Sequence, residues 1–286
     1  MRLITFVYQG KQSYGVVLHN DAILDLGSRL RERAPDVRAA LTKNLLTEIA
    51  SLASHAQPTL SCIAAKTERI KLGTSVINAL FHVPVVLARR FATLDQFSQG
   101  RVIAGLGQGW VKDEFETANI PFQRRGKGFE DYIGALRAAW GPDPVQYEGR
   151  YYRIVESDIG PKPFQTQGPP LLFGVTAPAS LERAARLADG INPVARSWSS
   201  LEQMANEFPE MVRHVGRDPH AMQMIVRSNS VVSRHTLPEP RSPFCGSLEQ
   251  IREDIQRLAS LGIRHVFFDL VAMPVDEQLR VLEQLL

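Results

Sequence analysis

Three glycine-containing runs and one histidine are the parts of this sequence whose residue types could do chemistry. The runs are Gly73-Thr74-Ser75-Val76, Gly107-Gln108-Gly109-Trp110 and Gly174-Val175-Thr176, and the histidine is His82. Small residues allow a backbone to approach a bound ring closely, and the N–H groups at the start of a helix bind phosphate. An imidazole with a pKa of about 6.5 could move a proton near neutral pH. These residue types could therefore form a binding site for a flat ligand that carries phosphate.

Each of these residues also has a purely structural explanation. Small residues in the first run could serve tight packing of a helix, and a Gly-x-Gly pair most often only turns the chain. Trp110 could stack near a substrate or cover the core, and Thr176 or Ser180 could cap the helix that begins near Leu181. His82 could be a solvated loop residue. The residues alone leave these alternatives open.

Composition and charge indicate which kinds of binding partner to expect. The 286 residues carry 33 basic and 30 acidic side chains, a net charge of +3, without a sustained basic tract, so we expect neither nucleic-acid nor membrane binding. No apolar run approaches the roughly 20 residues of a membrane span, and the first residues do not form a signal-peptide core, which favours a cytoplasmic location. Cys62, Cys245 and the histidines lack the spacing of metal ligands, so we expect no metal site.

Strands and helices alternate through most of the chain, which indicates a parallel α/β sheet with binding loops at the carboxyl ends of its strands. The sequence predicts a hairpin over 146–152. We expect strands at 70–76, 102–106, 171–174, 190–194, 222–232 and 265–270, with helices at 58–68, 84–97, 125–140, 179–188, 201–215 and 247–261. These are six parallel strands, whereas a closed (β/α)8 barrel requires eight. The prediction is an α/β, TIM-type barrel-like domain that lacks its first strands.

The first 53 residues do not show the alternation of strands and helices that the rest of the chain shows. Short strand-like runs at 3–8, 13–18 and 22–26 are separated by turn residues, which predicts a small antiparallel meander. We therefore expect two units: a β-rich N-terminal segment over 1–53 and a barrel domain over 57–286.

Several motifs, taken together and in order, resemble the bacterial luciferase-like monooxygenase family. They are Thr67–Thr74, Leu87–Asp95, Gly100-Arg101, Gly105–Trp110, Pro161–Pro163 and Ala184–Gly190. Residues 57–270 resemble most the branch of oxidoreductases that use the deazaflavin coenzyme F-420. The resemblance implies a TIM-type barrel and either F-420 or reduced FMN as cofactor.

The resemblance also implies which residues bind the cofactor. These are Gly73, Thr74, Ser75, Val76, Gly107, Gln108, Gly109, Trp110, Gly174, Val175 and Thr176, with the Ser75–Val76 peptide a candidate for a cis bond. His82 is the candidate catalytic residue, although it stands one place away from the family's usual histidine. Val175 occupies a position where the family usually has a second glycine.

The activity that this resemblance implies is hydride transfer between F-420 and a small organic substrate. A two-component monooxygenase, supplied with reduced FMN by a separate flavin reductase, is the alternative within enzymes. A catalytically inactive fusion protein with a scaffold or assembly role is an alternative of another class. The family favours a homodimer.

Residues 1–53 resemble the small N-terminal domain of fumarylacetoacetate hydrolase-type proteins instead. The similarity lies in Met1–Phe6, Tyr14–Val17 and Ile23–Gly27. The metal-binding carboxylates of that family belong to a larger domain that has no counterpart in this chain, so no hydrolase activity is implied. The sequence thus has the organisation of a chimera. We expect the appended strands or a second subunit to cover the open edge of the barrel, because a bare edge invites aggregation.

Overall fold

The structure is a computed structural model of the 286-residue chain. It describes the strands at 2–8, 11–17 and 23–25, residues 60–270, residue 273 and the helix at 275–285. The predicted boundary between the two units, at residues 53–57, lies outside these residues.

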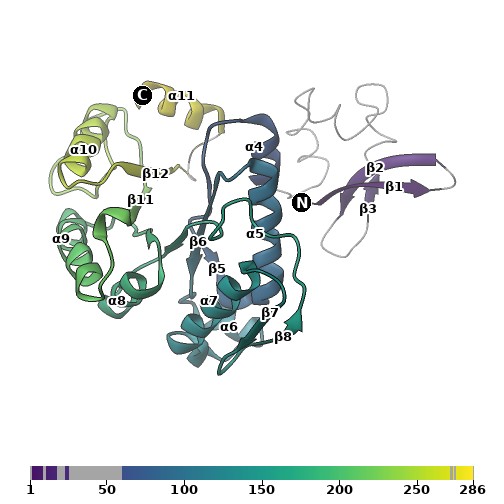
Figure 1. Cartoon of the computed structure of the whole chain (residues 1–286). Coiled ribbons are helices and arrows are strands. Elements are labelled where there is room, and N and C mark those ends of the chain that lie inside the picture. Colours follow the sequence, from purple (N-terminus) through teal and green to yellow (C-terminus); the bar gives the residue numbers. More distant parts are fainter. Residues whose placement is uncertain are drawn as a thin grey trace.

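A curled parallel sheet is the centre of the molecule (Figure 1). Its strand order is β12-β11-β10-β9-β6-β4, and β5 pairs with β6 beyond the end of β4. The strands are β4 (Leu72–Gly73), β5 (Ile77–Asn78), β6 (Val102–Gly107), β9 (Leu171–Phe173), β10 (Gly190–Ile191), β11 (Gln223–Asn229) and β12 (His265–Asp269). Each of the six predicted strands is confirmed, the first of them divided into β4 and β5. Among the described strands, β4 and β12 are the two outer ones, so the sheet is a half-barrel.

Helices cover the outside of this sheet (Figure 1). The predicted helices are confirmed as α4 (Leu60–Lys66), α5 (Pro84–Ser98), α7 (Lys127–Trp140), α8 (Pro178–Leu187), α9 (Trp198–His214) and α10 (Leu248–Ser260). Two further helices were not predicted, α6 (Lys112–Thr117) and α11 (Val275–Leu285). Short 3-10 turns complete the connections: η1 (Ala79–Phe81), η2 (Phe122–Arg124) and η3 (Pro219–Ala221). Pro84 and Pro178 begin α5 and α8, where the missing N–H costs nothing and the fixed φ favours a helix.

Two antiparallel elements stand apart from the half-barrel sheet. β7 (Val145–Glu148) and β8 (Arg153–Ser157) form the predicted hairpin between α7 and β9. At the amino end, β1 (Arg2–Tyr8), β2 (Lys11–Val17) and β3 (Ile23–Asp25) pair antiparallel in sequence order, which confirms the predicted meander.

Buried polar side chains tie the helices to the strands. The Arg101 guanidinium donates hydrogen bonds to the carbonyls of Ser98, Ile70 and Ala64 at 2.8, 3.0 and 2.9 Å. It thereby anchors α4 and the chain before β4 to the start of β6. The fully buried Asp95 of α5 accepts hydrogen bonds from the backbone and side-chain amides of Gln165 at 2.9 and 2.8 Å.

The larger of two hydrophobic clusters packs α5, α7 and α8 against β6 and β9, and one hydroxyl in it has no hydrogen-bond partner among the described residues. Tyr132 of α7 is fully buried, and its hydroxyl has no hydrogen-bond partner within the described residues. Burial, followed by the neighbouring Tyr152, raises the pKa of Tyr132 far above its ordinary value. An unpaired buried hydroxyl has lost its hydration without replacement, which costs stability.

We therefore expect Tyr132→Phe to raise the free energy of unfolding by about 1 kcal/mol, measured by urea denaturation. The matched control is Tyr147→Phe, because the Tyr147 hydroxyl donates to Asp131 Oδ1 at 2.7 Å and its loss should lower stability. If both variants lose stability, Tyr132 has a partner and this interpretation is wrong.

Candidate functional site

The first predicted run, Gly73–Val76, forms a bulge at the edge of the sheet. Gly73 pairs with Ile103 and Ile77 pairs with Leu106, so three residues, Thr74 to Val76, lie opposite only Ala104 and Gly105. The extra residue pushes the chain out of the ladder, as bulges do. The Ser75–Val76 peptide in this bulge is cis, as the resemblance implied.

Glycines on the neighbouring strands make room for the bulge. A Cβ on Gly105 would stand 1.7 Å from the Thr74 carbonyl oxygen, which no side chain permits. A Cβ on Gly107 would stand 2.8 Å from Val76 Cγ2, and one on Gly174 would stand 3.2 Å from the same atom. Val76 therefore lies against the ends of β6 and β9. The structure thus brings together one residue of each predicted run, Val76, Gly107 and Gly174.

Two hydrogen-bond donors remain available in the bulge. Within the part of the chain that the structure describes, the amide N–H groups of Ser75 and Val76 have no acceptor. Ser75 and Val76 are also only half-buried. The bulge therefore presents two backbone donors beside a surface of glycines, an arrangement that fits the carbonyl edge of a flat heterocycle.

A chain of polar side chains from β11, the end of β12 and the residue after β10 holds the bulge. The Ser75 hydroxyl donates to Asn192 Oδ1 at 2.6 Å, and Asn192 Nδ2 donates to the Ile225 carbonyl at 2.6 Å. The Arg227 guanidinium of β11 donates to the Ser75 carbonyl at 2.8 Å and pairs with Asp269 at the end of β12. Ser75 is therefore held through its hydroxyl by the residue after β10 and through its carbonyl by a residue of β11. Together these four residues, Ser75, Asn192, Arg227 and Asp269, form the Ser75 network.

In the second run (Gly107–Trp110), Gln108 and Gly109 have structural roles and Trp110 is exposed. Gln108 Oε1 accepts a hydrogen bond from the Gly126 amide at 2.8 Å and so fixes the residue before α7. Gly109 has a φ of 76°, and a Cβ there would stand 2.8 Å from the Phe115 ring. Trp110 leaves 79% of its surface exposed, so it does not cover the core. Its ring is available to a ligand.

The third run is mostly packed or already bonded. Val175 is buried in the larger hydrophobic cluster, so its side chain is part of the core. The amides of Thr176 and Ala177 both donate to the Ser180 hydroxyl, at 3.1 and 3.0 Å. Ser180 thus provides the capping, whereas Thr176 lies one residue before the N-cap, Ala177. A phosphate would have to displace that hydroxyl to reach these two amides.

His82 lies at the end of η1, before α5. It is half-buried, and burial lowers its pKa below the ordinary value of 6.5, with the nearby Arg90 guanidinium lowering it further. The imidazole is therefore neutral at pH 7, a state that accepts a proton rather than donates one.

Asn192, Arg227 and Asp269 were not predicted as site residues from the sequence. A signal for Arg227 exists, because it is the only charged residue in β11, whose neighbours are apolar or neutral. Asn192 and Asp269 follow or end short strands, where polar residues are common, and nothing in their spacing indicates that they meet.

Among the described residues, no group of three or more His, Cys, Asp or Glu side chains converges to bind a metal ion. Within the same residues, the helices are all too short or too polar to span a membrane.

Comparison with known proteins identifies the family to which this chain belongs. Residues 43–241 match the family model described as luciferase-like monooxygenase. An F420-dependent glucose-6-phosphate dehydrogenase of Nocardia farcinica is 35% identical over 187 residues, 63% of this chain and 54% of that protein. An FMNH(2)-dependent dimethylsulfone monooxygenase of Pseudomonas putida is 27% identical over 192 residues, 66% of this chain and 52% of that protein.

The fold has solved counterparts. The coenzyme F420-dependent tetrahydromethanopterin reductase of Methanopyrus kandleri superposes with a TM-score of 0.67 at 19% identity, over 79% of this chain and 84% of that one. This similarity confirms the predicted TIM-like class of the α/β sheet.

The Ser75 network leads to a prediction about stability. Arg227→Gln removes the bond to the Ser75 carbonyl and leaves the largely buried Asp269 without its cation, so we expect unfolding free energy to fall by about 2 kcal/mol in urea. Arg234→Gln is the control, because Arg234 is exposed and should change stability by less than about 0.5 kcal/mol.

A double variant checks the coupling of this pair. Arg227→Gln combined with Asp269→Asn should cost less than the sum of the single changes, because the two side chains contact each other. Strictly additive losses would contradict the network.

Proposed function

Because this chain belongs to the luciferase-like monooxygenase family, we propose that it is an oxidoreductase that transfers a hydride between coenzyme F-420 and a small organic substrate. The observation that carries the proposal is the bulge at Ser75 and Val76, with two unpaired N–H donors against Gly107 and Gly174. The Nocardia farcinica relative, named as an F420-dependent dehydrogenase, supports the deazaflavin.

In this proposal the cofactor-binding residues are those at the ends of β4, β6 and β9. The Ser75 and Val76 amides donate to the carbonyl edge of the ring, and Val76 with the glycines forms the surface beneath it. The further candidate positions are Gly73, Thr74, Gln108, Gly109, Trp110, Val175 and Thr176. When bound, the cofactor supplies the hydride chemistry, while the protein orients the ring and excludes water.

Two side chains have proposed roles beside the ring. The exposed Trp110 indole offers a flat face on which a substrate or ring can stack, with a gain of about 1 kcal/mol. His82 is the proposed catalytic residue, because its lowered pKa keeps it neutral and able to take up a proton at pH 7.

A second candidate function is a two-component monooxygenase that receives reduced FMN from a flavin reductase. The Pseudomonas putida relative, named as FMNH(2)-dependent, favours it. The bulge suits either ring, because both cofactors present a pyrimidine carbonyl edge.

We also propose that the chain consists of two units. We place the enzyme in residues 57–286 and a fumarylacetoacetate hydrolase-like β-rich unit in residues 1–53. The antiparallel pairing of β1, β2 and β3 supports the second unit. We further propose a cytoplasmic homodimer, since β4 and β12 leave the described half-barrel with two outer strands.

Titration of the purified full chain with oxidised F-420 and, separately, with FMN tests the function. We expect saturable fluorescence quenching at micromolar concentration with F-420 and none with FMN. Saturation with FMN alone would replace the proposal with the monooxygenase. Failure of both to bind would contradict the enzyme proposal and leave the inactive fusion protein.

Trp110→Ala locates the binding site within this titration. We expect the dissociation constant to rise about two- to tenfold, because the stacking face is lost. Phe97→Ala is the matched control, since Phe97 is also an exposed aromatic, 58%, but lies at the opposite end of α5 from His82 and the bulge. An equal effect of the two changes would contradict the location.

A further inference from the structure

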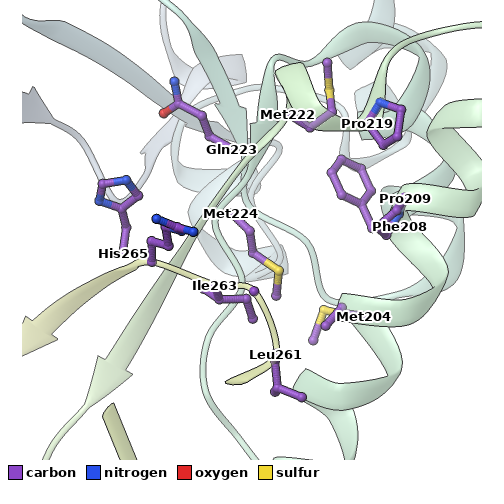
Figure 2. Close-up of a pocket in the computed structure, with 13 residues that line it drawn as sticks. Met204, Phe208, Pro209, Pro219, Met222, Gln223, Met224, Leu261, Ile263 and His265 are labelled. Carbon is purple, nitrogen blue, oxygen red and sulfur yellow. The ribbon is translucent and has the colours of Figure 1, made fainter. Parts of the chain in front are cut away.

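A separate cavity of about 280 Å³ opens at the other end of the half-barrel, by the amino ends of β11 and β12. Gln223 and His265 are the first residues of these strands, whereas the bulge lies at their carboxyl side. α9 and the chain that follows α10 complete its walls (Figure 2). None of the residues proposed to bind the cofactor lines it.

Apolar side chains form one part of the cavity wall. Met204 and Phe208 come from α9, Met224 from β11, and Leu261 and Ile263 from the turn after α10. The cavity lies between the two hydrophobic clusters of the described residues. Phe208 belongs to the larger cluster and Ile263 to the smaller one, which contains residues of α9, β11 and α10, and Met224 packs against both. Methionine side chains are flexible, so they can change conformation to fit an apolar ligand.

The remaining wall is polar and carries one cation. Figure 2 shows Gln223 and His265 on the side away from Phe208 and Met204, and Arg264 lies between Ile263 and His265 in the chain. Arg264 is exposed, and within the described residues its guanidinium has no ion pair or hydrogen bond. An unpaired guanidinium therefore stands beside a group of apolar side chains in one cavity.

We propose that this cavity binds a small amphiphilic carboxylate, with its apolar chain among the methionines and its carboxylate on Arg264. Guanidinium and carboxylate match in charge and in planar hydrogen-bond geometry. The volume of about 280 Å³ is slightly below the roughly 300 to 1,000 Å³ of ligand pockets, so the ligand is a short chain. The site is independent of the proposed redox function.

The test uses the full chain with ¹³C-methyl methionine, titrated with hexanoate and followed by NMR. We expect saturable shifts for Met204, Met222 and Met224, which line the cavity, and none for Met211, which lies outside it. Hexanol, the neutral analogue, should bind about three- to fivefold more weakly, and the difference should shrink at high salt.

Two variants separate the charge from the cavity. Arg264→Gln should remove the preference for hexanoate while hexanol binding stays unchanged. Arg69→Gln, an exposed arginine before β4 at the far end of the sheet, should keep the preference. Absent or unsaturable shifts, equal shifts at Met211, or hexanol that binds as tightly as hexanoate would overturn the proposal.

Discussion

The hydrogen bond from the Arg227 guanidinium to the Ser75 carbonyl joins distant strands of the curled sheet, and the proposed cofactor site depends on it. The described strands form a half-barrel, so ladder pairing alone does not fix the distance between β4 and β11. The Ser75 network spans that gap with one ionic pair and hydrogen bonds to backbone and side-chain oxygens. The Ser75 network uses only the hydroxyl and the carbonyl of Ser75. The amide N–H groups of Ser75 and Val76 therefore have no acceptor among the described residues.

The motifs that identify the family are largely structural in this chain. Asp95 and Arg101 satisfy backbone groups that bring α4, α5 and the segment before β9 against β6. Asp189 accepts the Leu171 amide at 2.8 Å and pairs with Arg137 at 3.0 Å, which fixes the entry to β9 and β10. These residues fix where the strands begin, and the opposite ends of the strands carry the small residues of the site. Gly105 belongs to the same group, because the bulge fits only beside a residue without Cβ.

Local patterns predicted most of the fold because apolar runs and helix-start prolines act within a few residues of chain. They predicted six strands and the main helices, and they placed Gly107 and Gly174 at strand ends. They did not predict that the first strand is divided by a bulge, since this follows from its register against β6. Asn192, Arg227 and Asp269 were missed for the same reason: they act through contacts across the sheet, and a single sequence records no such distance. The core position of Val175 likewise depends on which way the chain turns after β9.

The central claim is that the Ser75 and Val76 amides are the donors that bind the cofactor ring. The most direct measurement is the ¹⁵N chemical shift of the backbone amides as F-420 or FMN is added to the labelled protein. The account predicts that the largest shifts, saturating together, occur at Ser75 and Val76, with smaller ones at Gly107 and Gly174. A bound cofactor that leaves the Ser75 and Val76 amides unshifted would contradict it.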